Sequence, residues 1–221
     1  HHADAYFMLA QIYLYIEKMD SSKLNIKLYN ENLDEKTTAY TVIEVARLNS
    51  NVRNANKYVS NPEIVNISNL GSKINTENDE YVPLLSTSED LLLFTSRRMH
   101  GGNSLDPTGK PFEDIYFSTK GVGKANWSEA KLLNGKVNTP KHDACVGLSP
   151  NGKKLFVFRT NDNLVGGDLY ESTFKRGEWS AAVRMSEKIN SYESIEPSAS
   201  ISIDERVFYF SSNREGGFGG F

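Results

Sequence analysis

Hydrophobic residues follow two different periods along this chain, and the change between them divides it. In the segment Ala3–Lys18, apolar residues recur at three- and four-residue steps, namely Ala5, Leu9, Ile12 and Ile16. This spacing places them on one face of an α-helix. The pattern therefore predicts a helix at the start of the chain whose apolar face these four residues form.

Two more helices are predicted before residue 62. Within Ser22–Leu33, Leu24, Ile26 and Leu28 alternate as they would in a strand, but the register that continues from the first helix favours a second helix. The apolar spacing of residues 34 to about 58 predicts a third, linking helix.

The helical pattern ends at Asn61-Pro62. Proline lacks the amide hydrogen that a helix needs, and it restricts the residue before it. We therefore place a domain boundary at about residues 59–62, with a helical region over residues 1–60 and a second domain over residues 62–221.

After Pro62 the chain repeats one pattern three times. A turn is followed by a short β-rich run, a Gly-Gly loop and, in two copies, an Asp-(Ile/Leu)-Tyr strand. The β-rich runs are Leu91–Arg97, Leu155–Thr160 and Val207–Ser212. Each copy opens with an (Ile/Val)-Asn-(Thr/Ser) segment: Ile74–Thr76, Val137–Thr139 and Ile189–Ser191.

Copies of about four short strands, 50 to 65 residues apart, predict the blades of a β-propeller, which must stack because none can bury both faces alone. The blades lie near residues 62–117, 118–175 and 176–221, and the last is incomplete. Because three blades do not close a ring, we expect this sequence to be a fragment. The predicted fold class is α+β in two domains, helical first and all-β second.

Composition narrows the functional classes. A net charge of −3 gives no basic surface for nucleic acid, and no apolar run approaches the roughly 20 residues that span a bilayer. A single cysteine, Cys145, excludes an internal disulfide.

At this point the residues resemble known families. The segments SPNGKKLFVF…GGDLY and SIDERVFYFSSNREGGFGG resemble the TolB-type, WD-like β-propeller repeat. Tyr6, Leu9, Ala10 and Tyr13 follow the order of the first helix of a tetratricopeptide (TPR) repeat, although any αα-hairpin would also fit. One departure is the long insert His100–Glu113, which replaces the compact glycine loop and which we interpret as a surface loop of that blade.

The combination is similar to a group of Bacteroidetes envelope proteins, some serving type nine secretion, that carry TPR, propeller and a C-terminal OmpA-like domain. The resemblance implies a periplasmic or outer-membrane-associated protein. It implies protein partners in an envelope complex, and peptidoglycan binding only through a domain that this sequence does not contain.

Candidate chemistry is sparse. His142 and Asp143 beside Cys145 suggest a Cys-His nucleophile, but in a strand His142 points away from the face that Asp143 and Cys145 share. Cys145 is better explained by packing between strands. If the first strand of each blade lines a central channel, Asp143 and its counterpart Glu196 could face it, with His142 nearby. Val82 stands where a first-blade partner would be expected.

Other polar and aromatic residues recur with the repeat and are interpreted as structural: Asp114, Asp168, Trp127 and Trp179. Arg97 and Arg214 are predicted partners of the two aspartates. The Asn161–Asn163 loop lacks the closing bidentate acid of a calcium loop, and the acidic run Glu77–Glu80 reads as a solvated loop.

No catalytic, metal or cofactor motif is found. The peptidases with similar propellers carry a separate hydrolase domain. We therefore predict a non-enzymatic protein-interaction scaffold of the cell envelope without a cofactor. The alternative is a propeller that binds or senses a ligand or glycan in its central channel.

Overall fold

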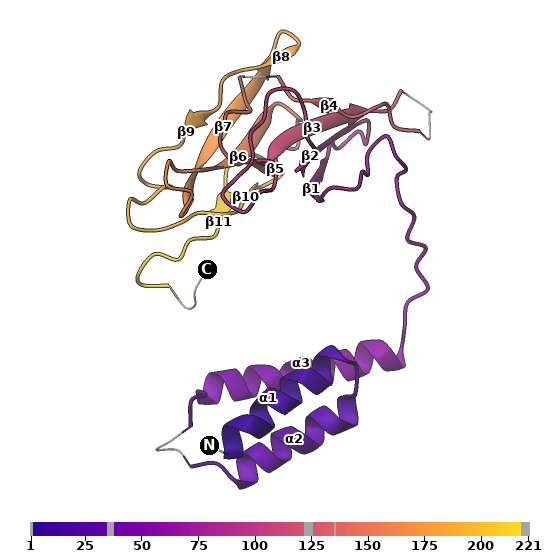
Figure 1. The fold of residues 1–221 in the computed structure, drawn as a ribbon, viewed down its shortest axis with the longest axis vertical. Helices are drawn as coiled ribbons and strands as arrows, with labels where there is room; N and C mark the ends of the chain where they lie inside the picture. Colours follow the sequence, from indigo (N-terminus) through magenta and orange to yellow (C-terminus); the bar gives the residue numbers. More distant parts are fainter. Residues whose placement is uncertain (1, 35–37, 122–125, 135, 218–221) are drawn as a thin grey trace. The chain divides into compact units, whose positions relative to one another are not determined.

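The computed structural model describes residues 2–34, 38–121, 126–134 and 136–217. These residues form three N-terminal helices followed by several antiparallel β-sheets, an α+β arrangement (Figure 1). The chain divides into two compact units at Ile67/Ser68, whereas the sequence pattern placed the boundary at residues 59–62. None of the described helices has the length and apolarity needed to cross a bilayer.

The first unit contains α1 (His2–Tyr15), α2 (Met19–Glu31) and α3 (Val42–Ser60). Its core is built around Phe7 and Tyr29, whose rings lie 5.5 Å apart. The buried Ser22 hydroxyl of α2 donates to the Ala10 carbonyl of α1 at 2.7 Å, so small residues let the two helices approach closely. Residues 24–28, whose alternating apolar side chains would also suit a strand, lie within α2.

The predicted apolar face of α1 is not the face that packs. Leu9, Ile12 and Ile16 are exposed, while Phe7 and Ala10 lie in the core. The reason is that α1 is apolar nearly all round, so its spacing is compatible with two faces. Only one of them meets α2 and α3, and the other remains uncovered in this unit.

The third helix starts later than predicted. Its N-terminus is fixed by a capping box, in which Thr41 Oγ1 accepts from Glu44 N and the Glu44 carboxylate accepts from Thr41 N at 2.7 Å. Thr38–Thr41, which the apolar spacing predicts to be helical, therefore lies before the helix. Residues 35–37 of the predicted helix lie outside the described residues. The helix ends at Ser60, just before the predicted stop at Asn61-Pro62.

The second unit consists of antiparallel strands in three sheets. The first sheet has the order β1-β2-β3-β4 and consists of Glu80–Leu85, Leu91–Ser96, Asp114–Thr119 and Lys131–Leu132. The second sheet consists of β5 Asp143–Leu148, β6 Lys154–Thr160, β7 Gly167–Lys175, β8 Glu178–Trp179 and β9 Val183–Arg184, with β8 and β9 both paired to β7. The third sheet consists of β10 Ala199–Ile201 and β11 Phe208–Phe210.

A serine organises the turn between the first and second strands of each repeat. Its hydroxyl oxygen accepts from the backbone N–H that opens the second strand, and the pairs are Ser86 with Leu91, Ser149 with Lys154 and Ser202 with Val207. The fourth turn residue has a positive φ, 57° at Glu89 and 69° at Gly152. This local chemistry explains why the repeated turns are so visible in the sequence.

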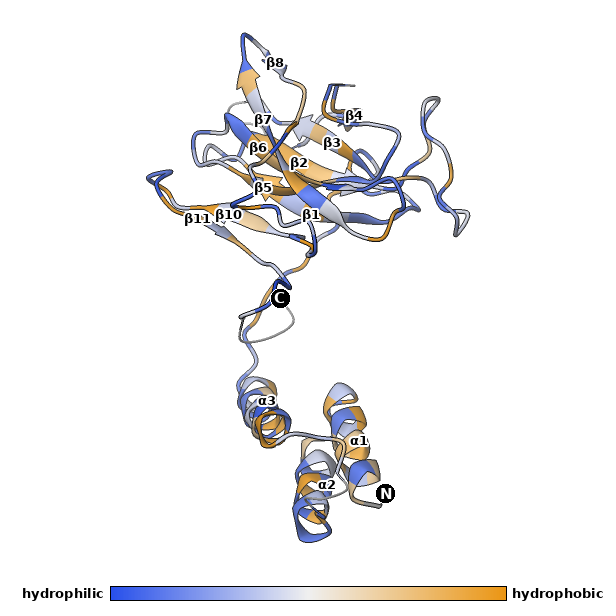
Figure 2. Ribbon diagram, turned by 90° about the vertical axis from the view of Figure 1, so that its left-hand side faces the viewer, coloured by the Kyte–Doolittle hydropathy of each residue, from blue (hydrophilic) through white to orange (hydrophobic). Residues whose placement is uncertain are grey.

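Apolar faces of successive sheets pack on one another. Leu93 and Ile115 of the first sheet meet Cys145, Leu155 and Val157 of the second in one buried cluster. Figure 2 shows hydrophobic residues on the central strands of the second unit, β2 among them. The faces come so close that a Cβ on Gly147 would lie 2.7 Å from a backbone oxygen of the third sheet.

An asparagine from each following repeat ties the sheets together, and we call this contact the asparagine strap. Asn138 accepts from Ile115 N at 2.8 Å and donates to the carbonyl oxygens of Ile115 and Leu133, both at 3.0 Å. Asn190 makes the same three contacts with Leu169 and Met185. Each strap therefore binds the start of the third strand in the preceding repeat, just before the residues that pair with β4 or β9.

Candidate functional site

Each repeat contains a buried carboxylate near its first strand that pairs with an arginine near the end of its second strand. We call this arrangement the acid–arginine clasp. In the second repeat, Arg159 Nε donates to Asp143 Oδ1 at 2.5 Å, and Arg159 Nη2 donates to Val137 O at 2.6 Å. The backbone and hydroxyl of Thr139 occupy Asp143 Oδ2 at 2.6 and 2.7 Å. Asp143 is fully buried, so none of its oxygens reaches solvent.

Glu196 has the same surroundings in the third repeat. Ser212 Oγ donates to Glu196 Oε1 at 2.7 Å, and Arg214 Nη2 lies 3.1 Å from the same oxygen. The backbone N–H of Ser191 donates to Oε2 at 3.3 Å. Glu196 is also fully buried. The two predicted channel carboxylates therefore lie in separate, equivalent clasps, each neutralised by its own arginine.

The first repeat has a clasp that the sequence reading missed. Its acid is Glu80, which lies at the start of β1, two residues before the expected position Val82. Arg98 Nη2 donates to Glu80 Oε1 at 3.1 Å and to Ile74 O at 2.7 Å. Thr76 Oγ1 donates to Glu80 Oε1 at 2.6 Å. The prediction that Glu77–Glu80 is a solvated loop is thus wrong for Glu80, whose side chain is largely buried.

Burial and hydrogen bonding act in opposite directions on the clasp carboxyls. Burial raises the pKa of Asp143 above its ordinary value, although Thr139 and Arg159 favour the ionised form. The net pKa of Glu80 is lowered. Burial acts to raise it, but the hydrogen bonds to the carboxylate, those from Thr76 first, outweigh that effect. The partners thus compensate for desolvation to different extents.

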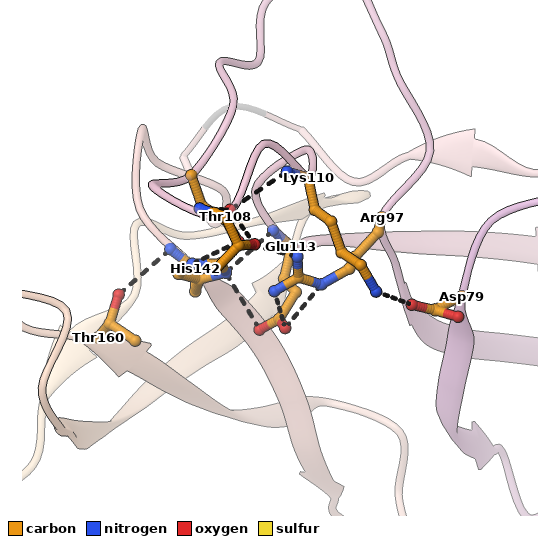
Figure 3. Close-up of polar contacts among 8 residues, drawn as sticks. Asp79, Arg97, Thr108, Lys110, Glu113, His142 and Thr160 are labelled. Atoms are coloured by element: carbon orange, nitrogen blue, oxygen red, sulfur yellow. Dashed lines mark hydrogen bonds and ion pairs between the residues drawn. The ribbon is translucent and has the colours of Figure 1, made fainter.

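His142 faces the insert that separates β2 from β3, where its ring lies beside Glu113 and Arg97 (Figure 3). Its Nδ1 lies 3.4 Å from Glu113 Oε2 and its Nε2 lies 3.8 Å from Asp106 Oδ2. Arg97 binds both acids, with Nη1 2.9 Å from Asp106 and Nε and Nη2 at 3.1 and 2.9 Å from Glu113. This polar cluster anchors the insert, which we had interpreted as a surface loop, against the start of the second sheet.

Charge and hydrogen bonding stabilise the ionised acid at the centre of this cluster. Thr108 donates its hydroxyl to Asp106 at 2.5 Å and its backbone N–H at 2.7 Å. These bonds, together with Arg97, hold the pKa of Asp106 well below its usual range. Burial and the neighbouring Glu113 raise the pKa of Tyr81 far above its usual value. The polar groups of the cluster are directed at one another.

Cys145 is fully buried and has no nucleophilic geometry. Its thiol lies 3.5 Å from Thr95 Oγ1 and donates to Val82 O at 3.3 Å. Burial raises the pKa of the Cys145 thiol to about 12. Since His142 lies among the insert acids, the structure does not bring a base to this sulfur.

The repeat aspartates have partners other than those predicted. Asp114 pairs with His100 Nε2 at 2.9 Å, and Asp168 pairs with Arg184 through two bonds of 2.8 and 2.9 Å. Arg97 instead serves the insert and Arg214 serves a clasp. The nearer partners prevail because the third strand places each aspartate at the loop end of the sheet.

The two tryptophans differ in surroundings. Trp179 is buried in the core between the first two sheets. Trp127 is partly exposed, packs on the Phe94 and Tyr116 cluster, and has Lys120 Nζ 5.0 Å from its ring centre.

The asparagine-rich loop is a turn. The backbone N–H of Val165 donates to the side-chain oxygens of Asn161 and Asn163 at 3.2 and 3.0 Å, and Asp162 pairs with Lys141. Across the described part of the chain, no three His, Cys, Asp or Glu side chains are grouped so that they could hold a metal ion.

Comparisons with models of protein families, with curated proteins and with solved structures found no match to this chain.

Proposed function

We propose that this chain is a non-enzymatic protein-interaction scaffold of the bacterial cell envelope, built from a TPR-like helical region and β-propeller blades. The propeller part is supported by the repeated four-stranded antiparallel order β1-β2-β3-β4 and its counterpart in the second repeat. Asparagine straps and interlocking apolar faces join each sheet to the next, as stacked blades require.

The observation that carries the interaction role is the uncovered apolar face of α1. Its residues are half or more exposed, namely Met8 54%, Ile12 52% and Tyr15 86%, and so is Ile16, 52%, directly after the helix ends. A helix that is apolar on both faces is normally covered on both. In stacked helical hairpins the second face is covered by another helix, so this stripe fits a helical partner segment.

The polar chemistry of the second unit supports a structural role in the same way. The carboxylates of Asp143 and Glu196 are buried and bound to Arg159 and Arg214, so they offer no open oxygen to a ligand in a channel. In the described part of the chain, the two carboxylates that the channel alternative depends on are therefore already bound within the protein.

The envelope location, the link to type nine secretion and the attachment to peptidoglycan through another domain rest on the family resemblance. Under this proposal the protein is periplasmic or outer-membrane-associated, and its partners belong to an envelope assembly.

A photo-crosslinking amino acid tests the interaction role in the native, full-length protein. Placed at Ile12, it should give one reproducible adduct with an envelope protein. Placed at Lys27, an exposed position on α2, it should give no such adduct. Equal labelling at both positions, or recovery of the protein only as a free monomer, would contradict the proposal.

A further inference from the structure

A polar pocket of about 340 Å³ lies between the second and third sheets. One wall is the loop that joins β6 to β7, and the other is the segment that leads into β10. Its polar lining includes Asn161, Asp168, Arg184, Tyr192, Glu193, Ser194 and Asn213.

Hydrogen bonds and close packing hold both walls in place. Asn213 Oδ1 accepts from Ile195 N at 2.8 Å, and Asn161 N donates to Gly166 O at 3.0 Å. Gly166 has a φ of 130°, and a Cβ there would lie 3.2 Å from the Ile195 side chain. The pocket is therefore preformed, as binding sites for small molecules usually are.

The equivalent place between the first and second sheets is already filled. There the loop of residues 97–113 between β2 and β3, which contains the long insert, supplies the polar cluster around Asp106 and His142. The corresponding loop in the second repeat is only residues 161–166. Between the first and second sheets, the chain therefore fills this position with the polar side chains of its own β2–β3 loop. In the next repeat the same position is an open pocket.

The polar groups in the pocket suit hydroxyl groups. The Asp168 carboxylate and the Arg184 guanidinium form a bidentate pair, and both side chains remain partly exposed, 25% and 40%. Ser194 also lines the pocket, and its buried Oγ has no hydrogen-bond partner in the described structure. Neighbouring hydroxyl groups on a ligand can both donate and accept hydrogen bonds. They could therefore donate to the Asp168 carboxylate, accept from the Arg184 guanidinium and bind the Ser194 hydroxyl.

An aromatic ring completes the pattern. Tyr192 lines the pocket, and its side chain is fully exposed. A flat apolar ring face beside paired polar groups fits a molecule with C–H bonds on one side and hydroxyls around its rim. With the exposed Glu193 beside Asp168 and Arg184, acidic groups outnumber basic ones among these three, which disfavours an anionic ligand.

We propose that this pocket binds a neutral sugar ring, with the ring stacked on Tyr192 and its hydroxyls bound by Asp168, Arg184 and Ser194. A volume of 340 Å³ lies near the lower end of ligand cavities and suits one or two sugar units. The site is distinct from the α1 surface and from the buried clasp carboxylates.

The test uses saturation-transfer NMR and titration of the full chain with methyl glycosides of glucose, galactose, mannose and N-acetylglucosamine, and with glucuronate. At least one neutral sugar should saturate the protein at millimolar concentration, and glucuronate should bind more weakly. Tyr192→Ala should weaken binding about 3- to 10-fold, the range that aromatic contacts provide. Tyr209→Ala, an exposed tyrosine on β11 outside this pocket, is the matched control and should bind like the wild type.

Three results would overturn the proposal. They are the absence of saturation by every neutral sugar, binding of glucuronate at least as tight as that of the neutral sugars, and unchanged affinity in Tyr192→Ala. Ser194→Ala provides a second variant, and it should weaken the same sugar while leaving thermal unfolding unchanged. Because α1 takes no part, failure here leaves the interaction role intact.

Discussion

The asparagine strap gives the sharpest test of how the sheets are held together. Asn190 is almost fully buried, and its side chain makes three hydrogen bonds, to Leu169 N, Leu169 O and Met185 O. Asn190→Ala removes all three and leaves the Leu169 N–H without its acceptor. The Leu169 oxygen keeps the bond that it accepts from Met185 N at 2.9 Å.

The expected magnitude follows from these contacts. Three hydrogen bonds at about 1 kcal/mol each give a loss of about 3 kcal/mol, and the buried N–H that is left without an acceptor makes this a lower estimate. For a unit of this size that corresponds to a fall in Tm of about 6–12 °C. Asn75 is the counterpart in the first repeat; it is only partly buried and accepts from Leu70 N at 3.1 Å. Asn75→Ala should cost less than about 1 kcal/mol.

Urea unfolding followed by tryptophan fluorescence measures the effect on the second unit alone. Both tryptophans of the chain, Trp127 and Trp179, lie in that unit. The midpoint should drop strongly for Asn190→Ala and little for Asn75→Ala, with similar slopes. Equal losses in the two variants would refute the claim that the strap stabilises the sheet.

Three further predictions concern the second unit. Hydrogen bonds, those from Thr108 first, lower the pKa of Asp106 in the folded protein. The ionised Asp106 carboxylate therefore stabilises the fold at pH values above the pKa of an aspartate in the unfolded chain, about 4, and this stabilisation is lost as the pH falls below that value. Asp106→Asn should therefore lose less stability than the wild type between pH 5 and 2, and an identical acid slope would contradict this. Glu89→Gly should raise stability by about 0.5–1 kcal/mol because φ is +57° there, and any loss in urea unfolding would count against it. Gly167→Ala, whose Cβ would lie 2.2 Å from a backbone oxygen, should cost about 2 kcal/mol or more, while Gly101→Ala, with open space around it, should be neutral; equal midpoints would contradict the clash.

Local chemistry made the strands of the second unit predictable. Each turn that a serine organises consists of four consecutive residues, as in Ser149-Pro150-Asn151-Gly152. The strand that follows it is a short run of residues that favour β-structure. Such signals need no tertiary information. The start of α3 was missed because the capping box of Thr41 and Glu44 sits inside a segment whose apolar spacing already looked helical.

Long-range choices were less accessible. The sequence shows two apolar faces on α1 and cannot say that Phe7, and not Ile12, meets the other helices. Glu80 lies in the acidic run Glu77–Glu80, which favours a solvated loop, but its spacing from Arg98 indicates the clasp. It lies eighteen residues before Arg98, as Glu196 does before Arg214, and in both cases a serine stands two residues before the arginine. Comparison of spacings, and not of charge runs, would have found this clasp.

The strap also bears on the order in which the protein folds during synthesis. Ile115 and Asn138 are 23 residues apart, so the first sheet emerges from the ribosome before the side chain that completes it. Each sheet must therefore wait for the beginning of the next repeat, and the growing chain always ends in one unfinished sheet. Fragments cut at the repeat borders would keep this defect permanently, whereas fragments that extend beyond Asn138 or Asn190 would end on a completed sheet.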